Sequence, residues 1–417
     1  MKRVAHGATG RMLMPGRTAT AAKLCTPPAS SSMCLVEKRR YSIQPERVPK
    51  PGQGVYTCGT GRNAQLGVGD LEDYQLPVPV QELPVGASYI DAAAGWTQNF
   101  LLTTRHELYY WGSSGVYALL PMRRDKRIYY PTLCEPAQSL GIVKIRTGRQ
   151  HGIALSKNGE VYIWGNSEFG QTGLGNKEAQ HLPIRMEFFR DKSIVDVSCG
   201  LDHSAAVSKD GRVWTWGYGI DGQLGHNGTE DELKPKELTV IRGEGISRVT
   251  CGTDFTGLLN ETEGRLFTFG NGEAGQLGHG ERGLCLEPSV VPLDNVKEVA
   301  AGGAHMLALT KDGQAWSWGW GEDGRLGHGA TEDFLKPEPI PTLGPAVGVV
   351  SVSAGGGHSL ALTESGQVYG WGFNASGRLG LGNESSVMTP TLIKALADKR
   401  VLRAICGLDH SLFITQA

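Results

Sequence analysis

The segment Val161-Tyr162-Ile163-Trp164-Gly165 ends on a Trp-Gly pair that returns, intact or with one residue changed, seven times along the chain. The glycines of the seven copies are Gly59, Gly112, Gly165, Gly217, Gly270, Gly319 and Gly372. Successive copies are 53, 53, 52, 53, 49 and 53 residues apart. A period near fifty residues indicates one supersecondary unit stacked on copies of itself. The structure of one repeat, and the way in which repeats stack, therefore determine the fold.

Each Trp-Gly pair closes a short strand that carries a second aromatic residue two positions before the tryptophan. These aromatics are Tyr56, Tyr109, Tyr162, Trp214, Phe267, Trp316 and Tyr369. Residues two apart on a strand lie on the same face, so each repeat presents an aromatic pair to a neighbour. Burial of one large apolar side chain contributes about 1.5–3 kcal/mol. The repeated pairs predict a continuous core.

A glycine-rich turn follows most of these strands, as in Gly222-Gln223-Leu224-Gly225 and Gly377-Arg378-Leu379-Gly380. The pattern predicts backbone at positive φ, which glycine adopts without steric cost. A phosphate-binding loop is disfavoured, because no Gly-Lys-Ser/Thr follows and no helix is expected there.

The rest of each repeat predicts further antiparallel strands. Residues 194–207 alternate apolar positions around a turn, Asp210-Gly211 forms another turn, and a Pro-rich stretch at 335–340 supplies a fourth strand in its repeat. Four strands in each of seven repeats predict an all-β fold, a seven-bladed β-propeller. The strand at 55–58 lacks its preceding pair, and 401–415 is such a pair without a Trp-Gly strand. We therefore expect the two chain ends to share one blade, which removes exposed strand edges.

These landmarks resemble the regulator of chromosome condensation repeat family, whose signature adds a Gly-x-x-His-Ser/Thr turn, seen here from Gly200 to Ser204. The resemblance covers about residues 52–417. It implies a seven-bladed propeller that binds other proteins, and nucleotide exchange on a small GTPase in one branch. A plant ultraviolet receptor of this family would carry Gly-Trp-Arg-His-Thr repeats, to which only Gly95-Trp96-Thr97-Gln98 comes near.

Histidine stands three residues after a turn glycine in five repeats, and an acid precedes it in two. In the family's exchange factor, acids and histidines of these turns meet the GTPase. The resemblance thus implies these partner-binding candidates: Asp202, His203, Asp254, His305, His358, Asp409 and His410. A residue found in nearly every repeat also suits a role in the fold, holding the turn by hydrogen bonds. Gln98 and Phe255 take the histidine position in the other two repeats. The exchange factor also uses a hairpin inserted in one blade, for which repeat intervals of 49–53 residues leave little room.

The N-terminal residues differ from the rest in charge. Residues 1–41 hold eight Lys/Arg and one acid, which leaves 33 basic and 41 acidic residues in 42–417, a net charge of −8 there. A leader rich in Arg, Ser and Thr is typical of an organellar transit peptide. Arg39, Arg40, Tyr41 and Ser42 resemble a mitochondrial processing site. We expect a transit peptide at 1–41, a linker at 42–51, a propeller at 52–417 and a mitochondrial location. The alternative for the leader is a disordered basic tail that binds chromatin.

A basic run interrupts the acidic part of the chain where the turn of the second Trp-Gly copy has decayed. It contains Arg123, Arg124, Lys126 and Arg127. Such a run is a candidate contact for a protein or for RNA, or else a solvated loop. The net negative charge of the remainder argues against DNA binding, which needs Lys and Arg to neutralise phosphates.

Motifs for ordinary catalysis are missing from the sequence. It has no Gly-x-Ser-x-Gly and no His-Glu-x-x-His, and its cysteines form no CxxC pair, so neither a metal nor another cofactor is expected. No run of eighteen apolar residues predicts a membrane span. We expect a monomeric, non-catalytic propeller that binds macromolecules and supports assembly of mitochondrial ribosomes, RNA or respiratory complexes. The partner would be a protein, such as a ribosome assembly factor or a small GTPase. The alternative function is guanine-nucleotide exchange on that GTPase.

Overall fold

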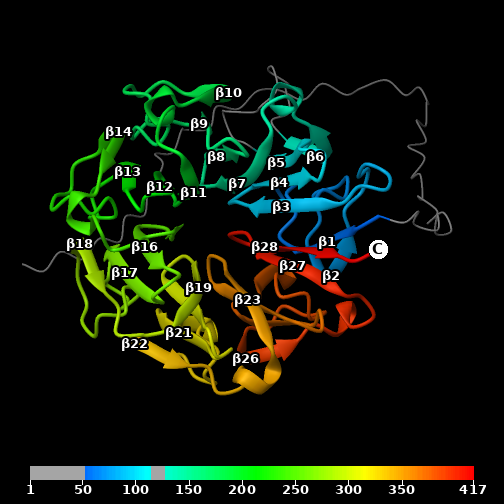
Figure 1. The fold of residues 1–417 in the computed structure, drawn as a ribbon. Helices are drawn as coiled ribbons and strands as arrows, with labels where there is room; N and C mark the ends of the chain where they lie inside the picture. The colour runs from blue at the N-terminus through cyan, green and yellow to red at the C-terminus, as the bar shows by residue number, and fades with distance from the viewer. Residues whose placement is uncertain (1–51, 114–126) are drawn as a thin grey trace, which may run out of the picture. The chain divides into compact units, whose positions relative to one another are not determined.

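The computed structural model describes residues 52–113 and 127–417, and the 28 strands found there form seven antiparallel sheets of four. The sheets are arranged around a central axis (Figure 1). The innermost strands are β3 (Tyr89–Ala94), β7 (Ile142–Thr147), β11 (Ile194–Cys199), β15 (Arg248–Cys251), β19 (Val296–Ala301), β23 (Val349–Ala354) and β27 (Val401–Cys406). The second strands are β4 (Gln98–Thr103), β8 (His151–Ser156), β12 (His203–Ser208), β16 (Phe255–Asn260), β20 (His305–Thr310), β24 (His358–Thr363) and β28 (His410–Thr415).

The third strands carry the Trp-Gly pairs or their replacements. They are β5 (Leu108–Ser113), β9 (Val161–Gly165), β13 (Val213–Gly217), β17 (Arg265–Gly270), β21 (Ala315–Gly319), β25 (Val368–Gly372) and β1 (Gly54–Gly59). The outermost strands are β6 (Arg127–Leu133), β10 (Gln180–Arg185), β14 (Glu232–Glu237), β18 (Cys285–Val290), β22 (Phe334–Pro339), β26 (Val387–Leu392) and β2 (Tyr74–Pro79). Short 3-10 helices lie between strands: η1 (Glu135–Ala137), η2 (Glu187–Phe189), η3 (Thr239–Ile241), η4 (Glu322–Gly324), η5 (Pro345–Val347), η6 (Ala375–Gly377) and η7 (Lys394–Leu396).

We number the sheets as blades along the chain, so that blade 1 holds β3–β6 and blade 6 holds β23–β26. Blade 7 joins both chain ends in the order β2-β1-β28-β27. Its central pairing runs from Gly54 opposite Thr415 to Gly59 opposite His410. Two predictions are confirmed: seven blades of four antiparallel strands, and one blade shared by the N- and C-terminal strands.

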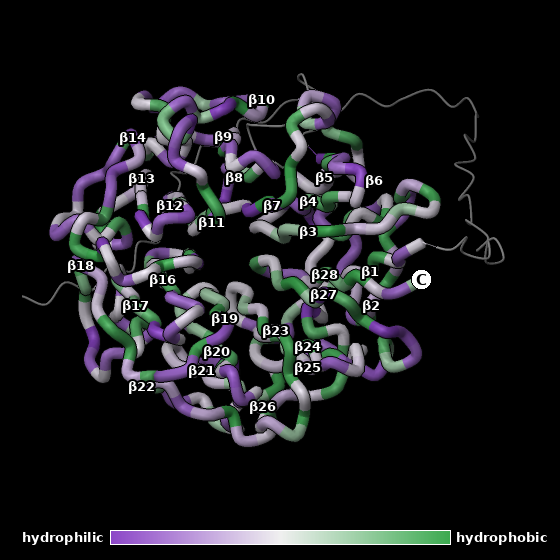
Figure 2. The backbone as a smooth tube through the Cα atoms, viewed as in Figure 1, coloured by the Kyte–Doolittle hydropathy of each residue, from purple (hydrophilic) through white to green (hydrophobic). Residues whose placement is uncertain are grey.

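The hydrophobic core lies between neighbouring blades. Trp111, Trp216, Trp318 and Trp371 are completely buried. The ring of Phe189 lies 5.6 Å from the rings of both Trp214 and Trp216, so a 3-10 helix between two blades contributes to the same core. Hydrophobic stretches recur from sheet to sheet around the ring (Figure 2). The buried hydrophobic residues of the described chain form six clusters, each shared by neighbouring blades, so the core is divided among the blade interfaces. Tyr56, Tyr109, Trp316 and Tyr369 are only partly buried beside these clusters.

The four completely buried tryptophans also donate a hydrogen bond to the preceding blade. Trp216 Nε1 donates to the carbonyl oxygen of Gln171 at 3.0 Å, and the same carbonyl accepts from Ser204 Oγ at 2.9 Å. The acceptor is the second residue of the glycine-rich turn, and the arrangement repeats for Trp111 with Gln65, Trp318 with Gln276 and Trp371 with Arg325. One turn carbonyl thus fixes the position of the next blade.

The glycines of these turns have the predicted positive φ. Gly222 and Gly225 both have φ of +74°. A Cβ atom on Gly225 would lie 2.7 Å from the ring of Phe269 in the next blade. Glycine is therefore required here both for the backbone conformation and for the close approach of the turn to the neighbouring aromatic side chain.

Candidate partner-binding face

The predicted site residues lie at one edge of the propeller, which we call the turn face. It consists of the turns between first and second strands and the loops between third and outermost strands. Both lie at the same end of the sheet, since His203, which begins β12, pairs with Gly217, which ends β13. The Asp and His candidates of all the repeats are thus brought to a single face.

The histidines point into the structure, each toward the next blade. His151, His203, His305, His358 and His410 are all buried. Their Nε2 atoms lie 2.8–3.1 Å from side-chain oxygens of Ser204, Thr256, Ser359, Ser411 and Asn99, respectively. They therefore hold neighbouring blades together and lie out of reach of a partner.

The hydrogen-bond pattern fixes the protonation state of these histidines. Thr256 Oγ1 donates its proton to the carbonyl of Gln223, so it accepts from the Nε2–H of His203. Nδ1 of His203 has no hydrogen-bond partner, as expected for the neutral tautomer. Burial lowers the pKa of His203 to about 3 and that of His151 to about 4. The ring fits beside Gly200, where a Cβ atom would lie 2.1 Å from it.

Two repeats have another residue at the histidine position, and the side chain that this residue faces in the next blade explains each replacement. Phe255 faces blade 5, where Met306 stands in place of the hydroxyl residue, and the two share one hydrophobic cluster. Gln98 faces blade 2, where Gly152 has no side chain to accept a bond, and Gln98 Nε2 donates to Thr147 Oγ1 at 2.8 Å instead. Histidine is thus replaced in the two blades whose neighbour lacks an oxygen-bearing side chain at the facing position.

The acids remain at the surface or just below it. Arg149 Nη2 donates to Asp202 Oδ2 at 2.5 Å, and Gln171 Nε2 donates to the other carboxylate oxygen at 3.2 Å. Arg378 Nη1 donates to Asp409 Oδ1 at 2.6 Å. Asp202 and Asp409 are therefore held in place by cations of the preceding blade.

Asp254 is different, because no hydrogen bond or ion pair within the described residues engages its carboxylate. Burial, followed by the charges of Asp221 and Asp202, raises the pKa of Asp254 to about 6. Burial likewise raises the pKa of Asp202, against the lowering effect of Arg149. Blades 3 and 4 therefore concentrate negative charge around one half-buried carboxylate on the turn face.

Aromatic and apolar side chains accompany these acids. Trp320 is 39% exposed and Ile220 53% exposed. The guanidinium of Arg325 lies 4.1 Å from the ring centre of Trp320, and that of Arg378 lies 4.5 Å from the ring centre of Phe373. Partly exposed aromatics beside arginine are the groups most enriched in protein–protein interfaces. These residues were not singled out from the sequence, although each follows a Trp-Gly pair or lies in its turn.

The central channel is almost closed at the turn face. Backbone hydrogen bonds run from blade to blade there, such as Leu201 N to Thr253 O at 3.2 Å and Leu408 N to Gly95 O at 3.1 Å. The remaining space is about 100 Å³, lined largely by turn glycines. Among the described residues, the turn face thus presents a rim of loops around a nearly closed channel end.

The remaining predicted residues are basic or belong to the N-terminal leader. Arg127 begins β6 opposite Ser113, at the turn-face end of blade 1. Outside the described residues are Arg123, Arg124, Lys126, Arg39, Arg40, Tyr41 and Ser42. Within the described ranges, no three His, Cys, Asp or Glu side chains are placed to hold a metal ion. No described helix has the length and hydrophobicity needed to cross a bilayer.

Comparison with known proteins supplies a family. A sequence model of the RCC1-like domain matches residues 54–413. The human E3 ubiquitin-protein ligase HERC2 is 34% identical over 365 residues, 86% of this chain but only 8% of the ligase. The ultraviolet-B receptor UVR8 of Arabidopsis thaliana is 33% identical over 366 residues, 88% of this chain and 71% of the receptor. The mitochondrial RCC1 domain-containing protein RUG3 of the same plant is 36% identical over 270 residues, 63% of this chain and 60% of RUG3.

Solved structures share the fold. Prp20p from Saccharomyces cerevisiae, studied for its binding to Gsp1p and histones, superposes with a TM-score of 0.78 at 24% identity over 88% of this chain and 92% of its own. Human WBSCR16 superposes with a TM-score of 0.77 at 24% identity over 88% of this chain and 99% of its own.

The cross-blade pairing predicts how substitutions combine. His305→Phe should lower the free energy of unfolding by about 1–3 kcal/mol, because Ser359 Oγ loses its buried donor. His305→Phe with Ser359→Met copies the natural pair Phe255–Met306, so it should be more stable than His305→Phe alone. The carbonyl of Arg325 loses the bond from Ser359 but keeps the bond from Trp371 Nε1, as the carbonyl of Gln276 beside Met306 keeps the bond from Trp318. Urea unfolding of the parent, both single variants and the double variant measures these effects. Simple addition of the two single-substitution effects would contradict the pairing.

The neutral histidines also predict the pH dependence of stability. A histidine with a pKa of 6.5 when unfolded and about 3 when folded binds its proton only in the unfolded state at intermediate pH. Its contribution is complete above pH 6.5 and is lost as pH falls toward 3, at about 1.4 kcal/mol per pH unit. The free energy of unfolding should therefore fall between pH 7 and pH 5. His305→Phe/Ser359→Met removes one such histidine, so it should lose about 1–2 kcal/mol less over that range; an unchanged slope would refute the assignment.

Proposed function

Because the chain belongs to the family of proteins with an RCC1-like domain, matched over residues 54–413, we propose that it is a non-catalytic propeller that binds a protein partner through its turn face. The observation that carries this proposal is the unpaired Asp254 carboxylate, whose pKa is raised by burial and by the charges of Asp221 and Asp202. The exposed Ile220 adjoins Asp221 in the sequence. A partner with a basic side chain would neutralise this charge and cover the apolar neighbour.

The charges of the turn face favour a protein over nucleic acid. Asp202 and Asp409 already engage Arg149 and Arg378, so these cations are partly neutralised before any phosphate could approach. Protein–nucleic acid contacts rely on Lys and Arg that remain free to replace counterions. Partly exposed aromatics and arginines instead suit the desolvated centre of a protein interface. RNA binding would therefore depend on other cations, such as those of the basic run that contains Arg123 and Arg124, which are outside the described residues.

The cellular setting forms part of the proposal. The basic, acid-poor leader supports import into mitochondria. RUG3, which is 36% identical over 270 residues, is described by name as mitochondrial. We extend the proposal to a role in assembling mitochondrial ribosomes, RNA or respiratory complexes, with the propeller acting as a monomeric scaffold.

Guanine-nucleotide exchange on a small GTPase is the second candidate. Asp202, Asp254 and Asp409, which the family resemblance marked for this role, all lie on the turn face, and Prp20p was studied for its binding to Gsp1p. Within residues 52–113 and 127–417, however, every strand belongs to one of the seven sheets, so no extra hairpin is seen there. The two candidates differ in whether nucleotide release accelerates.

The face can be tested with Asp254→Asn/Ile220→Ser, which removes one unpaired charge and one exposed apolar group. The amount of the main partner protein recovered with this tagged variant from mitochondria should fall by about tenfold. The matched control, Asp210→Asn/Asp312→Asn, changes exposed acids of turns at the opposite edge and should retain it. Recovery of equal amounts of the partner with both variants would contradict the assignment of the binding site to the turn face. Faster nucleotide release from an organellar GTPase, abolished by Asp254→Asn, would favour the exchange factor.

Import makes a separate prediction. Protein isolated from cells should begin at or near Ser42, because processing would follow the Arg39-Arg40-Tyr41 segment. N-terminal sequencing of the mature protein measures this, and Arg39→Ala/Arg40→Ala should leave an unprocessed precursor. Mature protein that still begins at Met1 would remove the basis for a mitochondrial location.

A further inference from the structure

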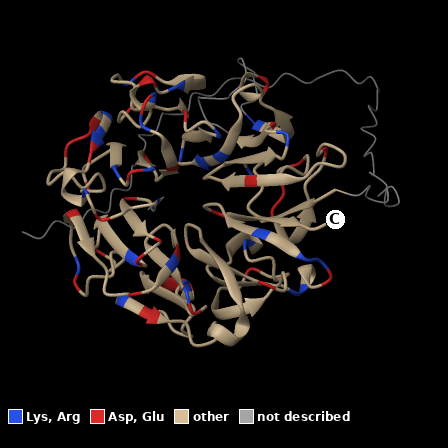
Figure 3. Cartoon of the chain, in the orientation of Figure 1, with Lys and Arg blue, Asp and Glu red and all other residues tan. Residues whose placement is uncertain are grey.

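A second feature of the propeller lies inside its channel, away from the turn face. Equivalent residues of the seven inner strands form a ring of charges. Their equivalence is fixed by register, since each is paired with the fifth residue of the second strand of its blade. In the order of blades 1–7 they are Asp91, Lys144, Asp196, Arg248, Glu298, Ser351 and Arg403. The charges alternate in sign except at Ser351. Acidic and basic bands on β3, β7 and β27 are visible beside the channel in Figure 3.

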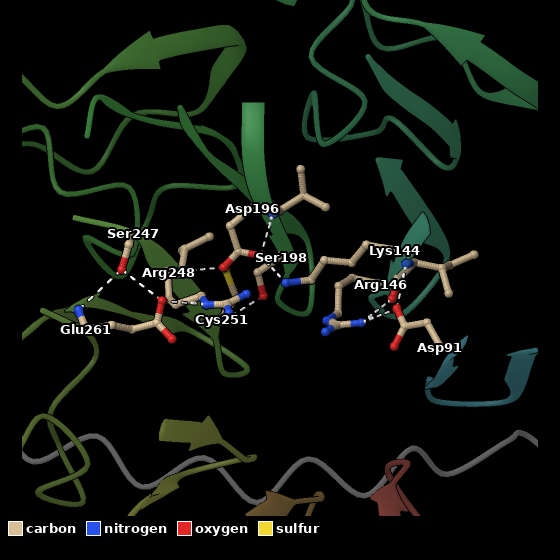
Figure 4. A network of polar contacts seen from close by, with 12 residues as sticks. Asp91, Lys144, Arg146, Asp196, Ser198, Ser247, Arg248, Cys251 and Glu261 are labelled. Carbon is tan, nitrogen blue, oxygen red and sulfur yellow. Dashed lines mark hydrogen bonds and ion pairs between the residues drawn. The ribbon is translucent and has the colours of Figure 1, made fainter. Parts of the chain in front are cut away.

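The acids of this ring are turned toward the wall. Asp91 Oδ2 accepts from the backbone N–H of Ile145 in the next blade at 2.9 Å, and Asp196 Oδ2 accepts from Val249 N–H at 2.9 Å. Glu298 Oε1 accepts from Val352 N–H at 3.1 Å. Figure 4 shows the part of this network around Asp91 and Asp196. The carboxylates thus serve as acceptors for neighbouring strands, with little capacity left for a ligand.

The cations keep much more of their hydrogen-bonding capacity. Arg248 uses only Nε, which donates to Glu261 at 2.9 Å, and half of its side chain (50%) is exposed. Arg146 donates through Nη1 to Asp91 and to the carbonyl of Ile145, which leaves its Nη2 without a hydrogen bond to any described residue. Arg403 donates through Nη2 to the carbonyl of Ile90, and its Nη1 lies 3.7 Å from the Asp91 carboxylate. Lys297, next to the ring, makes no ion pair within the described residues. Donors that remain free in the channel therefore outnumber free acceptors.

The channel has room for a ligand. The cavity lined by the seven inner strands has a volume of about 770 Å³. It narrows at the turn face, and its lining at the other end includes Val350 and Leu402, which are exposed. A volume of roughly 300–1,000 Å³ is typical of small-molecule sites. Arginine side chains bind phosphate and carboxylate groups through paired N–H donors.

The geometry points to a binding site for a small polyanion, bearing phosphate or carboxylate groups, in this channel between Arg146, Arg248, Arg403 and Lys297. The ligand would enter at the end opposite the turn face. Its oxygens would accept from the free N–H groups of the arginines, while the acids stay bound to the wall. The site is independent of the partner-binding face, so a protein partner and an anion can bind together.

Isothermal titration of the full chain with pyrophosphate and with citrate, at constant ionic strength, tests the site. We expect saturable binding of one probe to one site, and the probe that binds identifies phosphate or carboxylate as the recognised group. Arg248→Gln should weaken binding about tenfold, because one charged contact is lost. The matched control is Arg242→Gln: Arg242 also donates through Nε to a glutamate and is 57% exposed, but it lies in a connection outside the channel. It should change affinity less than about twofold.

The result also distinguishes the site from general electrostatic attraction. Thermal melting of Arg248→Gln should match that of the parent, since Arg248 is half exposed, so that weaker binding reports the contact itself. Lys297→Gln supplies a second channel variant should Arg248→Gln fail to fold. No saturable binding of either probe, or equal weakening by Arg242→Gln and Arg248→Gln, would overturn the proposal.

Discussion

The propeller depends on one buried acceptor in each glycine-rich turn that the structure describes: the carbonyl oxygen that receives hydrogen bonds from the next blade. Gln171 shows the arrangement in full, since its carbonyl accepts from both Trp216 and Ser204, and Ser204 in turn accepts from His151 of the turn's own blade. A buried polar group without a partner destabilises a protein strongly. Loss of any member of this set therefore affects two blades at once, which explains why Phe255 occurs together with Met306.

This use of the repeated residues separates stability from binding. The histidines and the tryptophans are occupied between blades, and the channel acids are occupied along the wall. The groups with spare capacity are those that vary between repeats: Asp254 on the turn face, and arginines such as Arg248 in the channel. Function in a repeat protein of this kind is therefore expected where the repeats differ, because identical positions are already engaged in holding the ring together.

Much of the fold could be predicted from the sequence. Trp-Gly spacing gave the seven blades, the incomplete ends gave the shared blade, and turns such as Gly222–Gly225 gave positive φ. Asp202, Asp254 and Asp409 lie on one face because all three stand in turns between first and second strands, so the predicted fold already implies their common position. The sequence does not decide between a binding and a structural role for His203, because its partner Thr256 lies one repeat away and nothing local indicates the contact. The ring of charges in the channel cannot be predicted from the sequence in this way, because it is recognised only when the seven inner strands are aligned by their register.

The shared blade has a consequence for biosynthesis. β1 is the first strand of the propeller to be made, yet its partner β28 comprises residues 410–415. Synthesis runs from the N-terminus, and domains generally fold as units. The six other blades can therefore form while the edge of β1 that faces β28 stays unpaired until β28 has been made. An unpaired strand edge invites pairing with other chains, so the ring is open to misassembly until this last pairing closes it.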